Sequence, residues 1–251
     1  MATSKTGADS ARRALELLFA FTEQRPVASV RQLAEAIDAP VPSVHRYVAL
    51  LRDMGLIEEG VRGQYHLTLR VAALNRAARQ ATSIVDIAEP FMRQLSDEID
   101  ETVLLARLVH ALPVCIHRIE TPRRLRLSFE IGQNLPPLRG ASVRLLLGAL
   151  TPAERERYLD QALAAGALPP VNSRDEFLSD VERDVERGWA VSNQEIDEGV
   201  WAAAAPVTEA GRTVAAVSAP CLAFRLDKQK RAHIIDLVQK TAGQISGALS
   251  A

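Results

Sequence analysis

Cysteine and long apolar runs are scarce in this sequence, and both absences narrow what the protein can be. The two cysteines among 251 residues, Cys115 and Cys221, are too few for a disulfide framework, so we expect a protein of the reducing cytoplasm. Nowhere do about 18 consecutive apolar residues occur, so we expect no membrane-spanning helix. The residues from Met1 to Ser10 are small and polar, without the apolar centre of a signal peptide.

Sequence signatures of catalysis are also missing. No G-x-S-x-G turn, Gly-rich phosphate loop or catalytic Cys-His pattern occurs, so we expect neither an enzyme nor a cofactor. An enzymatic alternative would use Glu195 or Cys221. The acidic run from Glu195 to Glu198 is, however, typical of a solvated turn before a strand.

A metal sensor is a second alternative. Cys115 and His117 are two residues apart in an expected strand, which would put both on one face, and Cys221 could add a third ligand. No CxxC or HxxxH spacing accompanies them, and such spacing is typical of zinc sites. We therefore expect no metal.

The charge of the chain is nearly balanced overall but differs between its two parts. There are 30 basic and 31 acidic residues, for a net charge of −1. Residues 1–80 hold 11 Lys and Arg against 8 Asp and Glu, or +3, and the remainder holds 19 against 23, or −4. This asymmetry favours a DNA-binding N-terminal part. Because one copy carries so little positive charge, we expect a homodimer or a dimer of dimers on DNA.

Two short helices joined by a turn are predicted between Val30 and Asp53. Ser29 and Gln32 form a capping box at the start of the first helix. Pro42 suits the first turn of the second helix, where a missing N–H costs nothing. Residues at helical spacing then form the inward face of the second helix: Val44, Tyr47, Val48 and Leu51.

The outward face of the second helix is suited to the major groove of DNA. It carries no carboxylate before Asp53; Arg46 can bond a guanine, His45 can donate, and Ser43 can bond a phosphate oxygen. The residues from Glu58 to Leu67 predict a β-hairpin wing with a basic, Gly-bounded tip. An ordinary three-helix cap with a polar face is the alternative. The expected DNA-binding residues are Arg12, Arg13, Ser43, His45, Arg46, Arg52 and Arg62.

The whole chain predicts two α+β domains joined by a helix. We expect residues 1–9 to be disordered, 10–68 to form the winged helix-turn-helix, and 69–83 to form an Ala-rich linker helix. Residues 84–251 then form a domain of antiparallel strands flanked by helices. Its expected helices are 84–99, one starting at Thr151, 173–187 and 227–249, and its expected strands are 102–109, 113–120, 124–130, 189–194, 200–208 and 212–219.

Several segments resemble the IclR family of transcriptional regulators. The resemblance implies a sequence-specific regulator that binds double-stranded operator DNA, with repression favoured over activation. It also implies that the C-terminal domain is GAF-like and binds a small effector. The matching segments are Leu33–Glu35, Ala39–Arg46, Leu51–Ile57, Tyr65–Leu67, Asp100–Val103, Arg118–Glu120, Leu135–Pro136, Glu195–Val200 and Ala204–Val207.

The resemblance places the effector between the sheet and the loop and helix after the third strand. The family's His-Ala-Thr-Ala-x-Gly-Lys run is replaced here by Leu138 to Leu145, with Arg144 at the position of the Lys. Because helix N-terminal amides after Gly140 favour a carboxylate, we expect a small organic-acid or aromatic effector. Core packing is the alternative for each candidate. The expected effector-binding residues are Leu127, Phe129, Ala141, Ser142, Trp201, Ala202, Ser218 and Cys221.

Overall fold

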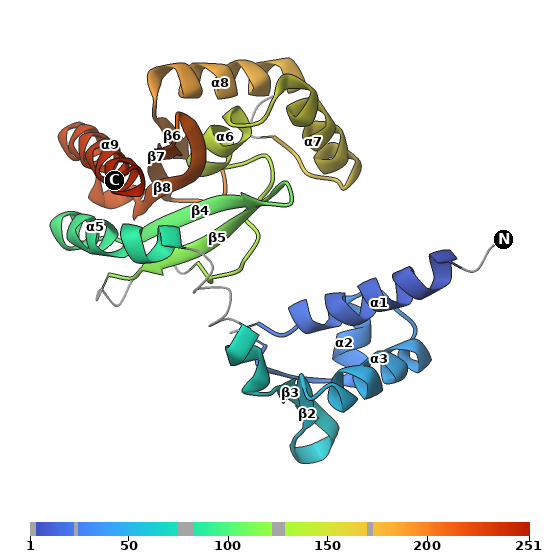
Figure 1. The fold of residues 1–251 in the computed structure, drawn as a ribbon. Helices are drawn as coiled ribbons and strands as arrows, with labels where there is room; N and C mark the ends of the chain where they lie inside the picture. Colours follow the sequence, from blue (N-terminus) through green and yellow to red (C-terminus); the bar gives the residue numbers. More distant parts are fainter. Residues whose placement is uncertain (1–3, 23–24, 75–82, 122–128, 170–172) are drawn as a thin grey trace. The chain divides into compact units, whose positions relative to one another are not determined.

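The computed structural model describes residues 4–22, 25–74, 83–121, 129–169 and 173–251. They form two compact units, unit 1 (Met1–Thr82) and unit 2 (Ser83–Ala251), and each has its own apolar core. Both units combine helices with antiparallel strands, so the expected α+β fold is confirmed (Figure 1). Among the residues described, no helix is both long enough and apolar enough to cross a bilayer.

Unit 1 is a winged helix-turn-helix. The predicted capping box begins its second helix: the Ser29 hydroxyl accepts from the Gln32 N–H at 3.3 Å, and the Gln32 side chain accepts from the Ser29 N–H at 2.9 Å. Pro42 lies in the first turn of the third helix, as predicted. The elements are α1 (Ser4–Phe19), β1 (Val27–Ser29), α2 (Val30–Ala36), α3 (Val41–Asp53), β2 (Ile57–Glu59), η1 (Val61–Gly63) and β3 (Gln64–Leu67).

The wing of unit 1 is the antiparallel hairpin β2–β3, and β1 pairs with the other edge of β3. Ile57 and Tyr65 of the hairpin are buried and pack against Val44, Val48 and Leu51 of α3. These apolar contacts therefore hold the wing against the inward face of α3 and leave the outward face of α3 exposed to solvent.

Helix α1 begins at Ser4, so the expectation that residues 1–9 are disordered is wrong for 4–9. The stretch has no proline, and Asp9 forms an ion pair with Arg12 one turn later at 2.9 Å. Such a pair supports helix across the expected start at Ser10. At the far end of unit 1, residues 70–74 are helical, and the rest of the expected linker helix, 75–82, lies outside the described residues.

Unit 2 is a five-stranded antiparallel sheet with helices on both faces (Figure 1). The strand order is β5-β4-β8-β7-β6. Its elements are α5 (Ser83–Ile99), β4 (Val103–Val109), β5 (Leu112–Ile119), α6 (Ala141–Gly148), α7 (Pro152–Ala164), α8 (Arg174–Arg187), β6 (Ala190–Asn193), β7 (Val200–Glu209), β8 (Arg212–Leu222), η2 (Ala223–Arg225) and α9 (Lys228–Leu249).

The two faces of this sheet have separate cores. Side chains of β4, β7 and β8 alternate between them, as successive residues of a strand must. Trp201, Ala203 and Val217 pack under α5 and α9, whereas Leu104, Ala204 and Ala216 pack under α6, α7 and α8. Whether a strand residue has an odd or an even number therefore decides which of the two cores its side chain packs into.

Three helices of unit 2 begin at a polar residue that caps them, at the positions where the sequence predicted each helix to start. Thr151 caps α7 with a full capping box, Ser173 caps α8, and Asp227 caps α9. Gly188 ends α8 with a left-handed φ of 76°. The strand expected over 124–130 is not tested up to residue 128, which lies outside the described residues, and Phe129 and Glu130 are not in a strand.

Candidate functional site

The outward face of α3 is the first candidate site. His45, Arg46 and Arg52 are exposed, and Nη2 of Arg46 donates to the Ser43 hydroxyl at 3.3 Å. Arg52 lies 3.9 Å from the Glu59 carboxylate of the wing. The four predicted DNA-binding residues of α3 thus share one solvent-facing surface.

The tip of the wing presents a fifth predicted residue. Arg62 lies between Gly60 and Gly63 and has a left-handed φ of 62°. Few residues with a side chain adopt that conformation, because their Cβ crowds the backbone. The turn holds Arg62 exposed at the end of the hairpin.

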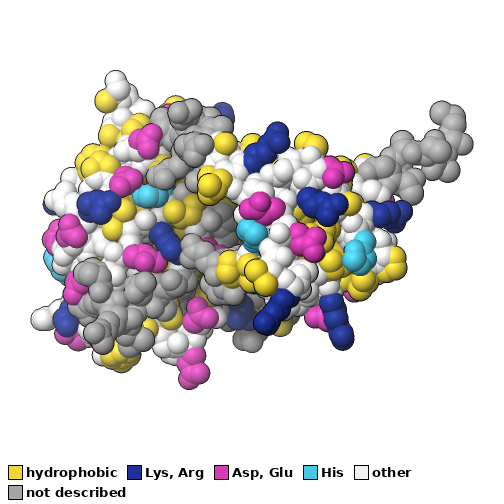
Figure 2. Space-filling view, turned by 90° about the horizontal axis from the view of Figure 1, so that it is seen from below, with side chains coloured by type: hydrophobic (Ala, Val, Ile, Leu, Met, Phe, Trp, Pro, Cys, Tyr) yellow, Lys and Arg dark blue, Asp and Glu magenta, His cyan; other side chains and the backbone are white. Residues whose placement is uncertain are grey.

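The two predicted contacts on α1 have partners inside unit 1. Arg13 donates to the Ile37 carbonyl at 2.6 Å, which ties α1 to the end of α2. Arg12 lies between the carboxylates of Asp9 and Glu16, at 2.9 and 3.4 Å. On the face drawn in Figure 2, basic and acidic side chains are interspersed and neither sign forms a continuous patch.

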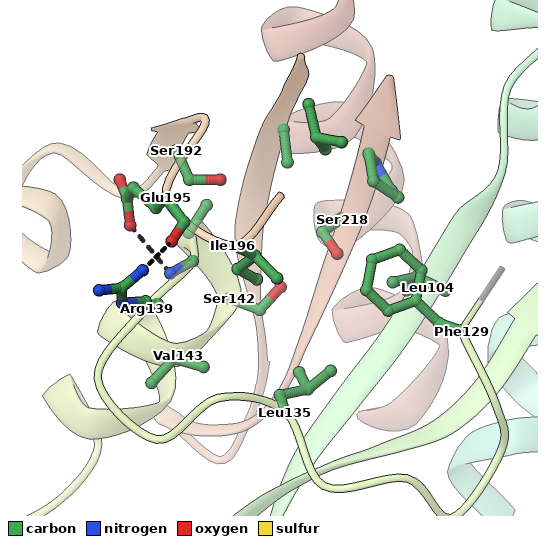
Figure 3. A pocket seen from close by; sticks show the side chains of 15 residues that line it. Leu104, Phe129, Leu135, Arg139, Ser142, Val143, Ser192, Glu195, Ile196 and Ser218 are labelled. Atoms are coloured by element: carbon green, nitrogen blue, oxygen red, sulfur yellow. Dashed lines mark hydrogen bonds between the residues drawn. The ribbon is translucent and has the colours of Figure 1, made fainter. Parts of the chain in front are cut away.

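The second candidate site is a cavity in unit 2, between the sheet and the start of α6 (Figure 3). Its volume for the centres of water molecules is about 40 Å³, where one water needs roughly 10–15 Å³. Ser142 on α6 and Ser218 on β8 turn their hydroxyls toward it, and the Phe129 ring lies beside Leu104. The lining residues are Leu104, Phe129, Leu135, Arg139, Gly140, Ala141, Ser142, Val143, Ser192, Glu195, Ile196, Val200, Ala202, Ser218 and Pro220.

Most of the expected effector-binding residues meet at this cavity, and two do not. Phe129, Ala141, Ser142, Ala202 and Ser218 line it, and Leu127 lies outside the described residues. The placement of Trp201 and Cys221 was wrong: both pack under α5 and α9, on the other face of the sheet. Successive side chains of a strand point to opposite faces of the sheet. Trp201 is one residue from Ala202 on β7, and Cys221 is three residues from Ser218 on β8, so both side chains point away from the cavity.

Glu195 is the main residue of the cavity that the sequence did not assign. The structure corrects the expectation of a solvated turn for Glu195 alone, because only 14% of this side chain is exposed, whereas Asp197 and Glu198 are exposed. Its carboxylate accepts the Gly140 N–H at 2.9 Å and Nη1 of Arg144 at 2.7 Å. Nη1 of Arg139 donates to the Glu195 carbonyl at 3.0 Å, which holds the loop after β6 (Figure 3).

Arg144 connects this carboxylate to a second one on α8. Its side chain is 5% exposed, and its Nε donates at 2.7 Å to Asp184, whose side chain is fully buried. Burial acts to lower the pKa of Arg144, but the carboxylates of Glu195 and Asp184 outweigh it and raise the pKa above its ordinary value. Asp184 also lies 2.9 Å from Nη2 of Arg187. One buried arginine therefore joins α6, α8 and the loop after β6.

The proposed geometry of the metal alternative was wrong. A β-bulge lies where β5 pairs with Leu105 and Ala106, so that His117 pairs with Leu105 and Cys115 with Ala106. The extra residue, Ile116, reverses the alternation. Cys115 consequently packs under α6, and His117 lies 3.4 Å from Glu89 of α5. Among the described residues, no group of three His, Cys, Asp or Glu could hold a metal ion.

A winged helix-turn-helix followed in the same chain by a separate α+β unit with a cavity is the architecture of a DNA-binding transcriptional regulator. Two family models match: the IclR helix-turn-helix domain over residues 10–60, and the bacterial transcriptional regulator IclR C-terminal domain over residues 76–247. The chain belongs to the IclR family of bacterial transcriptional regulators.

Individual relatives agree with this assignment along nearly the whole chain. The transcriptional regulator KipR of Bacillus subtilis is 28% identical over 224 residues, which cover 88% of this chain and 90% of KipR. A regulator from Rhodococcus sp. RHA1 of known structure is 25% identical, with a TM-score of 0.77 over 96% of this chain and 98% of that one. An IclR homologue from Microbacterium hydrocarbonoxydans, solved with 4-hydroxybenzoate, has a TM-score of 0.78 at 20% identity over 96% and 98% of the two chains.

Proposed function

We propose that this regulator binds operator DNA through α3 and the wing, and that a small molecule in the unit 2 cavity modulates that binding. The observation that carries the DNA part is the α3 surface, where Ser43, His45, Arg46 and Arg52 lie together and no carboxylate precedes Asp53. Arg46 reads bases and Arg62 contacts backbone phosphate. This division follows the general separation of specifying and positioning contacts.

The cavity supports the effector part of the proposal. Apolar walls with a few convergent hydroxyls are typical of small-molecule sites, and a homologue of the same fold is complexed with 4-hydroxybenzoate. A small aromatic compound or organic acid is accordingly the proposed effector. Linkage requires that the effector and DNA change each other's affinity by the same factor. The protein acts as a cytoplasmic homodimer or dimer of dimers, represses rather than activates, and is not an enzyme.

Replacing Arg46 tests the DNA part. We expect Arg46→Ala to weaken binding to DNA selected by the protein from a random pool by about 1–3 kcal/mol for each half-site, the value of one good base contact. Base preference at one position should relax, and binding to unselected DNA should change much less. Fluorescence anisotropy at fixed salt measures both affinities.

Arg174→Ala is the matched control. It removes one positive charge from α8, where Arg174 is paired with Asp160 at 2.6 Å, and should leave both DNA affinities unchanged. If Arg46→Ala behaved like this control, the placement of α3 as the reading helix would be wrong.

A further inference from the structure

Three buried serine hydroxyls of the cavity wall have no partner in the part of the chain that the structure describes. Ser142, Ser192 and Ser218 all line the cavity, and they are only 7%, 5% and 4% exposed. None of the described residues forms a hydrogen bond with any of these three side chains. Buried polar groups are almost always hydrogen-bonded, because an unbonded one is costly. The cavity wall therefore offers hydrogen-bonding groups that the folded chain itself does not use.

Two serines of unit 2 that lie outside the cavity do find partners within the chain. The Ser96 hydroxyl donates to the Glu101 carbonyl at 2.8 Å, and the Ser246 hydroxyl donates at 2.7 Å to a carbonyl one helical turn earlier. Hydroxyls in a protein interior are normally satisfied in this way. Ser142 and Ser218 differ because their hydroxyls are turned toward the cavity and toward one another (Figure 3). A molecule inside the cavity would supply the partners that these hydroxyls lack.

The pairing of the strands places these hydroxyls at two ends of the cavity. Ser192 on β6 pairs with Ala202 on β7, and Ala202 pairs with Pro220 on β8, so the three form one row across the sheet. Ser218 lies two residues along β8 from Pro220. Two strand spacings across the sheet and two residues along it separate the Cα atoms of Ser192 and Ser218 by about 12 Å. In Figure 3, Ser142 faces Ser218, and Ser192 lies apart from both.

The wall between the two ends is apolar. Ala202 lies between Ser192 and Pro220 in the row, and Val200 and Ile196 also line the cavity. The cavity is narrow, with about 40 Å³ for the centres of water molecules, so a ligand must be slender. Since each hydrogen bond takes up about 2.8 Å, a ligand that bonds at both ends needs polar atoms roughly 6 Å apart. A benzene ring with polar substituents in the para positions has about this reach.

We infer that the cavity binds a slender molecule with a hydrogen-bonding group at each end, one end held by Ser192 and the other by Ser142 and Ser218. The apolar wall at Ala202 and Ile196 contacts the body of the ligand between these ends. The inference rests on the proposed function and narrows it, from small aromatic compounds and organic acids in general to those with two polar ends. Ser192 is the residue that makes the second end of the ligand matter.

Two uncharged compounds of nearly equal size test the inference without knowledge of the effector. 4-Hydroxybenzyl alcohol has two polar ends, and 4-methylbenzyl alcohol has a methyl group in place of one hydroxyl. By calorimetry, wild type should bind the first at least tenfold more tightly, because the methyl group leaves a buried hydroxyl without a partner. Ser192→Ala should reduce this ratio to less than threefold. Ser179→Ala, which changes an exposed serine of α8, is the matched control and should keep the wild-type ratio.

Three results of this experiment would overturn the inference. They are a wild-type ratio below threefold, a tenfold ratio that survives in Ser192→Ala, and binding of neither compound to wild type. A diol that binds as predicted but leaves the affinity for DNA unchanged would count against the proposed function alone.

The stability of the ligand-free protein provides a second test. Because the Ser192 hydroxyl has no partner among the described residues, Ser192→Ala should leave the melting temperature unchanged or raise it. Ser96→Ala removes a buried hydroxyl that donates to the Glu101 carbonyl, and it should lower the melting temperature by about 2–4 °C. A fall in Ser192→Ala as large as that in Ser96→Ala would show that the hydroxyl serves folding, and it would overturn the inference.

Discussion

Arg144→Met removes the side chain that joins the carboxylates of Asp184 and Glu195 in unit 2. Asp184 is fully buried and Glu195 is 14% exposed, and removing one partner from a buried ion pair typically costs 3–5 kcal/mol. Arg187 remains 2.9 Å from Asp184, and the Gly140 N–H remains on Glu195. We therefore expect the lower end of that range, about 3 kcal/mol, with a fall in melting temperature of roughly 6–12 °C for a domain of this size.

Urea unfolding followed by tryptophan fluorescence measures this loss directly. Both tryptophans of the chain, Trp189 and Trp201, lie in unit 2, so the signal reports that unit alone. Arg183→Met is the control on α8, because Arg183 is 60% exposed, pairs with Asp180 at 2.6 Å and lies farther from Asp184, at 3.9 Å. Exposed pairs contribute about 0–1 kcal/mol. An Arg144→Met variant within 1 kcal/mol of wild type, or no more destabilised than Arg183→Met, would refute the argument from burial.

Two further predictions concern packing and a buried thiol. Gly148→Ala would make a Cβ overlap Cγ2 of Val185 where α6 meets α8, so we expect a loss of about 1–3 kcal/mol in urea unfolding. Gly243→Ala in α9 meets nothing within 4 Å and should gain up to about 1 kcal/mol; equal stability of the two variants would contradict the model of tight helix packing. Burial raises the pKa of Cys115 to about 11, so at pH 8 only about one folded molecule in a thousand carries the thiolate, and a disulfide reagent should label Cys115 only after unfolding. The unfolded thiol releases its proton near pH 9, below the pKa of the folded one. The contribution of the buried neutral thiol to the free energy of unfolding should therefore be complete below pH 9 and be lost as the pH rises toward 11. Rapid labelling of Cys115 in the folded protein at pH 8 would contradict the raised pKa.

The helices and strands were largely predictable because their signals are local. Ser173 and Gly188 mark both ends of α8, and each does so through its own backbone geometry. The winged helix-turn-helix was predictable for the same reason, since the capping box at Ser29 and Pro42 specify its two helices independently of the rest of the chain.

The cavity was only partly predictable, because its key contacts are long-range. The bond between Arg144 and Glu195 joins residues 51 positions apart, and no local rule pairs them. One signal was present: an arginine within the apolar helix Ala141–Gly148 needs a buried acid as its partner. The exclusion of Trp201 and Cys221 also followed from strand parity, whereas the bulge at Ile116 depends on how β5 pairs with β4 and could not be read from β5 alone.

The run of small residues along β7 sets the depth of the proposed effector cavity without involving its polar groups. Ala202 lines the cavity, and Ala203 beside it packs into the opposite core. A bulkier residue at 202 would reduce the depth of the cavity, yet it would leave Glu195, the serine hydroxyls and the packing under α9 in place. Related regulators could therefore diverge in the molecules that they sense by exchanging one side chain on this strand, while the framework that responds to the ligand stays the same.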